Sequence, residues 1–143
     1  MVTATDLLQQ KKSPAIHAIE PEAPVLEAVR LMAEHASGAL LVMNGTQLAG
    51  IVSERDYARK VVLLGRSSSE TPVWQIMSSP VHTVEPDTTV QQCMQIMTER
   101  RVRHLPVMRA GRVLGMLSIG DLVRAVLEEQ QRTIEQLEHY IHG

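Results

Sequence analysis

The chain contains no phenylalanine, one tryptophan and two tyrosines, so aromatic side chains make up only 2% of its 143 residues. Proteins that bind single-stranded nucleic acid without sequence preference stack the bases on several aromatic rings. This composition argues against such a stacking platform. The hydrophobic core must instead be built from Val, Leu, Ile, Ala and the eight methionines.

Cysteine and excess charge are also scarce. The single cysteine, Cys93, excludes an internal disulfide and favours a reducing compartment. Fourteen basic and sixteen acidic residues leave a formal charge of −2, so no overall basic field favours nucleic acid or an anionic membrane. Neither a leader peptide nor an apolar run long enough to cross a bilayer is apparent. We expect a cytoplasmic protein that binds neither nucleic acid nor membranes.

Sequence motifs of catalysis are missing too. No nucleophile elbow, P-loop, zinc motif or Rossmann glycine pattern occurs. Cys93 falls on the apolar face of a predicted helix, where a thiol is usually inert. His139 and His142 are three residues apart on the last predicted helix, but no third metal ligand is apparent. We therefore expect no enzymatic activity, no catalytic cofactor and no metal site.

What the sequence does contain is an internal repeat. Residues 17–62 align without a gap to residues 82–127 at an offset of 65, with 14 identities in 46 positions. Composition alone would give about three identities, so the chain contains a duplication. Each copy is predicted to form a strand, a helix, two strands and a second helix.

The hydrophobic pattern supports this order of elements. In each copy the first helix has four apolar residues at the i, i+3, i+4, i+7 spacing that buries one face. They are Val25, Ala28, Val29 and Met32 in the first copy, and Val90, Cys93, Met94 and Met97 in the second. Residues 44–47 and 109–112 have the composition of hairpin turns between strands. The expected fold class is α/β (α+β), with two β-α-β-β-α units.

We divide the chain into two domains and a connection. The first domain is residues 1–65 with a lead-in helix, residues 66–81 are a linker and a second lead-in, and residues 82–143 are the second domain. The linker is polar and has three consecutive serines, which is typical of a surface connection. The apolar stripe of the last helix continues beyond the end of the repeat at residue 127. We therefore expect this helix to pack against the other copy or against another subunit.

Several ordered features resemble the CBS domain family. They are the paired openings at 17–21 and 82–86, the turns Ser-Glu-Arg-Asp at 53–56 and Ser-Ile-Gly-Asp at 118–121, and Arg-His-Leu-Pro-Val at 103–107. The resemblance implies tandem CBS domains related by a pseudo-twofold axis, with two clefts that bind AMP, ADP or ATP, or less commonly NAD or S-adenosylmethionine. It also implies a homodimer that regulates a partner protein, which the sequence does not identify.

The resemblance and the residue chemistry together predict ribose and phosphate contacts in the second cleft. Asp121 would accept hydrogen bonds from the ribose hydroxyls, and Ser118 with the free N–H groups of the helix start would face the phosphate. Arg103 offers a charged, bidentate donor, and His104 adds charge only when it is protonated. The basic residues before the strand favour this cleft as the tighter of the two.

The base would lie against residues from the opposite copy. For the second cleft these are Ile16 and His17 of the opening strand. Gly38, which aligns with Arg103, would let the base approach the backbone closely.

The first cleft is expected to differ from the second. Arg55 offers a hydrogen-bond donor to a phosphate in the first cleft. The second copy has Gly120 at the aligned position, and Gly120 is predicted to line the second cleft. The two sites are therefore predicted to be inequivalent. The residues predicted for the first cleft are Val81, His82, Ser53, Arg55 and Asp56.

Each feature also has a plainer interpretation. Serine three residues before an acid at a helix start is nearly a capping box, which satisfies free N–H groups without any ligand. Arg103, with Arg100 and Arg101, would then be an ordinary solvated basic cluster. Two functions stay open: a non-enzymatic adenine-nucleotide sensor that signals energy or redox state, and a ligand-free module for dimerisation or docking.

Overall fold

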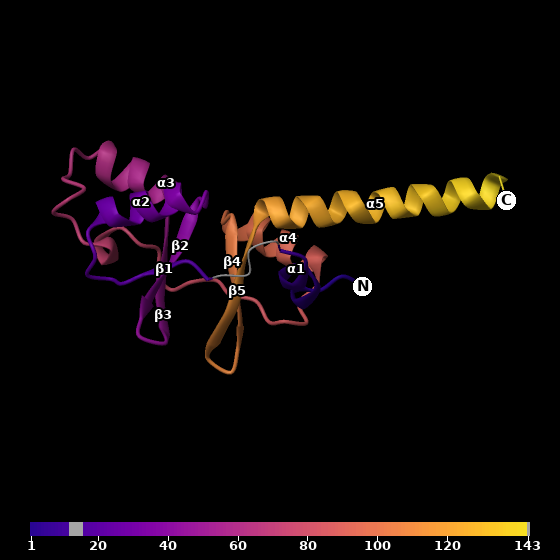
Figure 1. Ribbon diagram of the computed structural model, residues 1–143, viewed down its shortest axis with the longest axis horizontal. Coiled ribbons are helices and arrows are strands. Elements are labelled where there is room, and N and C mark those ends of the chain that lie inside the picture. The colour runs from indigo at the N-terminus through magenta and orange to yellow at the C-terminus, as the bar shows by residue number, and fades with distance from the viewer. Residues whose placement is uncertain (12–15, 143) are drawn as a thin grey trace. The chain divides into compact units, whose positions relative to one another are not determined.

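The structure, a computed structural model, describes residues 1–11 and 16–142 and separates them into two compact units. The first-repeat unit comprises residues 16–82 and 110–113, and the second-repeat unit comprises residues 1–11, 83–109 and 114–142. Both units combine helices with a small sheet (Figure 1). The expected α+β class and the two repeats are confirmed.

The first-repeat unit contains a three-stranded sheet in the order β1–β2–β3. Strand β1 pairs parallel with β2, and β2 pairs antiparallel with β3. Its elements are β1 (Ala18–Ile19), α2 (Val25–Glu34), β2 (Ala39–Asn44), β3 (Gln47–Ser53), α3 (Glu54–Tyr57), the π-helical turn η1 (Ala58–Val62) and the 3-10 turn η2 (Val73–Gln75).

The second-repeat unit has the same plan with a shorter opening strand. Strands β4 and β5 form a two-stranded sheet, and Val84 pairs with Val107 through a single parallel bridge, as Ile19 pairs with Val42 in the first repeat. Its elements are α1 (Ala4–Gln10), α4 (Val90–Arg100), β4 (His104–Arg109), β5 (Arg112–Ser118), whose first two residues are grouped with the first-repeat unit, and α5 (Ile119–His142).

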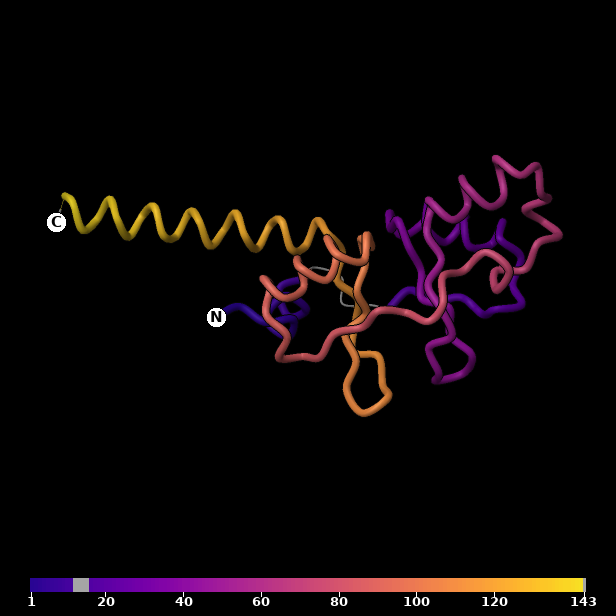
Figure 2. The backbone as a smooth tube through the Cα atoms, turned by 180° about the vertical axis from the view of Figure 1, so that it is seen from behind, coloured from indigo at the N-terminus to yellow at the C-terminus, as the bar shows by residue number. Residues whose placement is uncertain are grey.

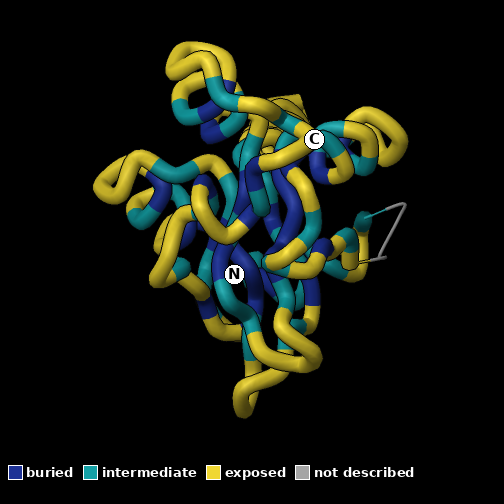
Figure 3. The backbone as a smooth tube through the Cα atoms, turned by 90° about the vertical axis from the view of Figure 1, so that its left-hand side faces the viewer, coloured by how far each residue is buried: buried dark blue, intermediate teal, exposed yellow. Residues whose placement is uncertain are grey.

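The turn and the helix face predicted for each copy are confirmed. Gly45 follows β2 with φ +64°, and Ala110 and Gly111 follow β4 with φ +51° and +77°, the left-handed region that two-residue hairpin turns require. The predicted helical stripes are the buried or partly buried faces of α2 and α4. Exposed residues gather in the loops and turns around these buried segments (Figure 3).

Each core is completed by a lead-in segment that comes from outside its own repeat. Ala4 and Leu7 of α1 are buried in the core of the second-repeat unit. Val73 and Ile76 are buried in the core of the first-repeat unit. The two spatial units therefore do not coincide with the domains that we assigned from the sequence. Residues 1–11 group with the second repeat, and residues 66–82 group with the first.

Backbone hydrogen bonds attach both lead-in segments. The N–H of Ala4 donates to Thr88 O at 2.8 Å. The N–H of Val90, at the start of α4, donates to Val2 O of the same lead-in segment at 3.1 Å. In the first-repeat unit the Val73 N–H donates to Ala23 O at 2.8 Å. These bonds satisfy backbone groups that the repeats leave open at the ends of their own elements.

We predict that replacing Leu7 by alanine destabilises the protein by about 2–4 kcal/mol, because it opens a cavity in the second-repeat core. Leu7 is only 3% exposed. Urea unfolding would measure the free energy of unfolding. The matched control is Gln9→Ala on the exposed side of the same helix, which should change stability by less than about 0.5 kcal/mol. Equal effects of the two variants would show that α1 is not part of the core.

Candidate functional site

The turn between β5 and α5 holds Asp121 in a defined position. The Ser118 N–H donates to Asp121 Oδ2 at 2.8 Å, and the Asp121 N–H donates to Ser118 Oγ at 3.2 Å. These reciprocal bonds form a capping box at the start of α5. The structural interpretation of this motif is therefore confirmed, and the cap holds the carboxylate in place without a ligand.

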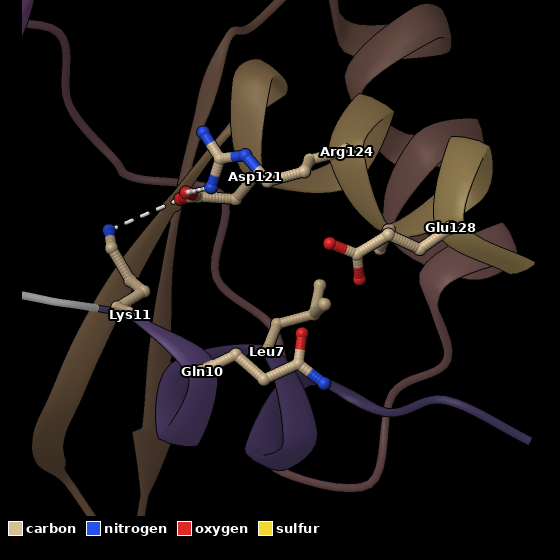
Figure 4. Close-up of a pocket in the computed structure, with 7 residues that line it drawn as sticks. Leu7, Gln10, Lys11, Asp121, Arg124 and Glu128 are labelled. Atoms are coloured by element: carbon tan, nitrogen blue, oxygen red, sulfur yellow. Dashed lines mark ion pairs between the residues drawn. The ribbon is translucent and has the colours of Figure 1, made fainter.

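Lys11 neutralises this carboxylate. Its Nζ lies 3.1 Å from Asp121 Oδ2 and also donates to Met116 O at 2.7 Å, although Lys11 and Met116 are 105 positions apart in the sequence. Arg124 Nη1 stands 3.7 Å from Asp121 Oδ1. Figure 4 shows Lys11, which follows the end of α1, and Arg124 of α5 converging on the carboxylate. Lys11 was missed in the sequence because no local pattern joins it to the turn.

The environment keeps Asp121 ionised. Burial acts to raise the pKa of Asp121, but the Ser118 backbone N–H and the Lys11 ammonium outweigh it, and the pKa lies below its usual value. Burial and the Lys11 ammonium lower the pKa of His104, against a partial opposing effect of Asp121. The lowered pKa of His104 favours the neutral imidazole, which disfavours the positive charge considered for this residue.

A pocket of the second-repeat unit borders Asp121 between α1 and α5 (Figure 4). Two cations and two acids face it, so it is polar and of mixed charge. Of the residues predicted for the second cleft, this pocket includes Asp121. Its lining residues are Leu7, Gln10, Lys11, Asp121, Arg124, Ala125 and Glu128.

Arg103 lies beside the same helix start. Its carbonyl accepts the N–H of Ile119 at 2.9 Å, while its side chain is exposed. A Cβ added at Gly120 would meet only Ser118 Oγ at 3.6 Å, so the turn is open at that position. The structure therefore brings Arg103, Gly120, Ser118 and Asp121 together at the start of α5.

The first-repeat unit repeats this arrangement around Asp56. The Ser53 N–H donates to Asp56 Oδ2 at 2.9 Å, and the Asp56 N–H donates to Ser53 Oγ at 3.2 Å. Lys60 Nζ lies 3.1 Å from Asp56 Oδ1 and donates to Ile76 O at 2.9 Å. Arg55, one residue before Asp56, is exposed.

The residues predicted to contact the base all belong to the first-repeat unit. The rings of His17 and His35 stack with centroids 3.8 Å apart, a neighbour that the sequence did not suggest. Ile16 is 42% exposed, and Gly38 O accepts the Glu54 N–H at 3.0 Å, as Arg103 O does for Ile119. Val81 is partly exposed and His82 is exposed. The roles of these residues in binding stay predictions.

Residues 1–11 and 16–142 contain neither a cluster of three potential metal ligands nor a candidate membrane-spanning helix. No group of three His, Cys, Asp or Glu side chains there could hold a metal ion, so His139 and His142 gain no third ligand. None of the helices described has the length and apolar character needed to span a membrane.

Comparison with known proteins identifies both repeats. The model of the CBS domain family matches residues 6–63 and 73–128. Mitochondrial CBS domain-containing protein CBSX3 of Arabidopsis thaliana is 47% identical over 124 residues, which cover 83% of this chain and 60% of that protein. The CBS domain-containing protein YhcV of Bacillus subtilis is 30% identical over 104 residues, or 73% of this chain and 74% of that protein. This chain thus spans about three fifths of the Arabidopsis relative.

Solved structures of CBS-domain proteins have the same fold as this chain. A CBS-domain protein from Burkholderia ambifaria is 47% identical and superposes with a TM-score of 0.87 over 90% of this chain and 96% of that chain. A CBS domain protein from Pyrobaculum aerophilum, solved in complex with AMP, is 27% identical with a TM-score of 0.78, covering 90% of this chain and 97% of that chain.

We predict that Lys11→Met raises the pKa values of both Asp121 and His104, because the ammonium favours the carboxylate and disfavours the imidazolium. NMR titration of both side chains would measure this. Because the folded pKa of Asp121 is depressed, its contribution to stability is present above the ordinary pKa and is lost as the pH falls through the folded value. The variant should weaken that acid-sensitive contribution.

The matched control is Gln10→Met, which introduces the same residue beside Lys11 without removing a charge. It should leave both pKa values in place. A shift of similar size in the control, or unchanged values in Lys11→Met, would contradict the ion pair.

Proposed function

This chain belongs to the CBS domain family and contains two CBS domains, and we propose that it is a regulatory module that binds an adenine nucleotide at the Ser118–Asp121 turn. CBS domain pairs are typically regulatory rather than catalytic, and the chain is a regulatory, signal-transduction type of CBS protein. The ligand and its contacts are our proposal.

The state of Asp121 is the main support. The carboxylate is ionised and held by the Ser118 N–H and Lys11 through Oδ2. Its Oδ1 is 3.7 Å from Arg124, which is beyond hydrogen-bonding distance and leaves acceptor capacity on that oxygen. An acceptor fixed in this way suits the two hydroxyls of a ribose, because little ordering remains to be done on binding.

The surroundings of the turn suit a phosphate. The exposed Arg103 side chain starts beside the first N–H groups of α5, and the open position at Gly120 leaves room for the ligand. Neutral His104 would donate or accept a hydrogen bond there rather than add charge. Ile16, His17 and Gly38 are proposed to complete the base site of this second cleft. The first cleft, formed by Val81, His82, Ser53, Arg55 and Asp56, is proposed to be an inequivalent site.

AMP, ADP or ATP are the proposed ligands, and NAD and S-adenosylmethionine share the adenosine that these residues would recognise. The AMP complex of the Pyrobaculum aerophilum relative supports this class of ligand. We further propose that the protein acts in the cytoplasm, as a homodimer, on a regulated protein whose identity is open.

A second candidate function rests on a specific observation. Both capping boxes are complete without a ligand, and Lys11 and Lys60 already neutralise Asp121 and Asp56. The module would then serve dimerisation or docking alone, with the acids acting only on helix stability.

Titration calorimetry of the full chain against AMP, ADP, ATP, NAD and S-adenosylmethionine separates these functions. We expect binding by at least one adenine nucleotide, and at least about a tenfold loss of affinity in Asp121→Asn, because an amide is a weaker acceptor for the ribose than a carboxylate. Asp56→Asn would report in the same way whether the first-repeat site is used.

The matched control is Gln92→Ala. Gln92 is exposed and forms a capping box with Thr89 in α4, so this change weakens a helix cap of the same kind away from the proposed site and leaves the lead-in helix that positions Lys11 intact. It should leave nucleotide affinity unchanged. An absence of heat with every nucleotide, or an equal loss of affinity in the control, would favour the docking module.

A further inference from the structure

Helix α5 extends well past the body of its own unit (Figure 2). Of its 24 residues only Leu122 and Ala125 are buried, and every described residue from 131 onward is exposed. A helical segment of this length is only marginally stable in water without packing. We therefore expect the outer part of α5 to pack against another helix or protein surface.

Five exposed apolar residues of α5 lie along one line of the helix, which we call the seam. Successive positions of the line are four, three, four, three and four residues apart, so the line stays on one face of the helix. One polar residue, Gln130, occupies the middle of the line. The seam consists of Val123, Leu127, Gln130, Ile134, Leu137 and Ile141, and its apolar members are 42–75% exposed.

We propose that the seam is a dimerisation surface that pairs with the seam of a second copy in antiparallel orientation. In this register Val123 faces Ile141 of the second copy, and Leu127 faces Leu137. The paired length from Val123 to Ile141 is about 27 Å at 1.5 Å per residue. This inference does not depend on nucleotide binding.

Charge selects the antiparallel orientation. In that register Arg124, beside the seam and 68% exposed in its side chain, stands opposite Glu138 of the second copy, and the twofold symmetry gives this ion pair twice. A parallel pair would place Arg124 opposite Ile119 of the second copy, which offers no acid across the interface. Antiparallel helices also set opposite ends of their dipoles beside each other, which is favourable.

The same segment is a poor match for a membrane surface. From residue 123 to residue 142 it has two arginines and four glutamates, a net charge of 2 − 4 = −2 with histidine neutral. Helices that lie on anionic membranes are rich in Lys and Arg on their polar face. A second copy, which supplies both an apolar line and the complementary charge, fits better.

Sedimentation equilibrium of the full chain tests the surface. We expect a dimer, and a dissociation constant raised at least about 100-fold in Leu137→Asp, because each dimer would bury this position twice. The matched control Gln136→Asp introduces the same residue one position away, outside the seam, and should leave the dissociation constant unchanged. A monomeric wild-type chain, or a dimer that Leu137→Asp does not weaken, would overturn the proposal.

Disulfide formation under mild oxidation tests the orientation. In the antiparallel register Gln131 lies beside Gln131 of the second copy, so Gln131→Cys should cross-link, while Ile141→Cys should not because position 141 faces position 123. The native thiol, Cys93, is buried and does not compete. Cross-linking of Ile141→Cys without that of Gln131→Cys would overturn the antiparallel arrangement.

Discussion

Neither repeat closes its core with its own residues alone, and the rest of the structure depends on this constraint. In the second-repeat unit the gap is filled by α1, whose Ala4 and Leu7 join the core. Burial of these apolar side chains stabilises the packing of α1 against the second-repeat core. Once α1 is held, the residue that follows it, Lys11, reaches Asp121. The electrostatics of the candidate site are therefore a consequence of how the core is completed.

In both copies a lysine pairs with the aspartate of the capping box, but the two lysines come from different parts of the chain. In the first-repeat unit Lys60 lies one helical turn after Asp56 and neutralises it. The second copy has Ala125 at the position that aligns with Lys60, and Lys11 supplies the ammonium from outside the repeat. A lysine on the acid's own helix moves with the acid, whereas Lys11 depends on the docking of α1. The second site is thus the one whose charge balance a change in the lead-in segment would alter.

Much of the fold followed from local patterns in the sequence. The duplication, the buried faces of α2 and α4, and the hairpin turns were predictable because they depend on periodicity and on turn residues. The positions of Ser118 and Asp121 at a helix start followed from the capping pattern. The Lys11 contact and the stacking of His35 on His17 were not predictable, since both are set by packing between segments that no local pattern connects. The lowered pKa of His104 likewise depends on burial and on Lys11.

The capping role of Asp121 is compatible with the binding role that we propose for it. A capping box uses the carboxylate as an acceptor for the Ser118 N–H through Oδ2, and an ionised carboxylate has about four acceptor positions. The cap therefore occupies a minority of them, while it removes the side-chain freedom that a binding group would otherwise lose. A motif that is complete as a helix cap is for the same reason a preorganised acceptor, so the completeness of the cap does not argue against a ligand.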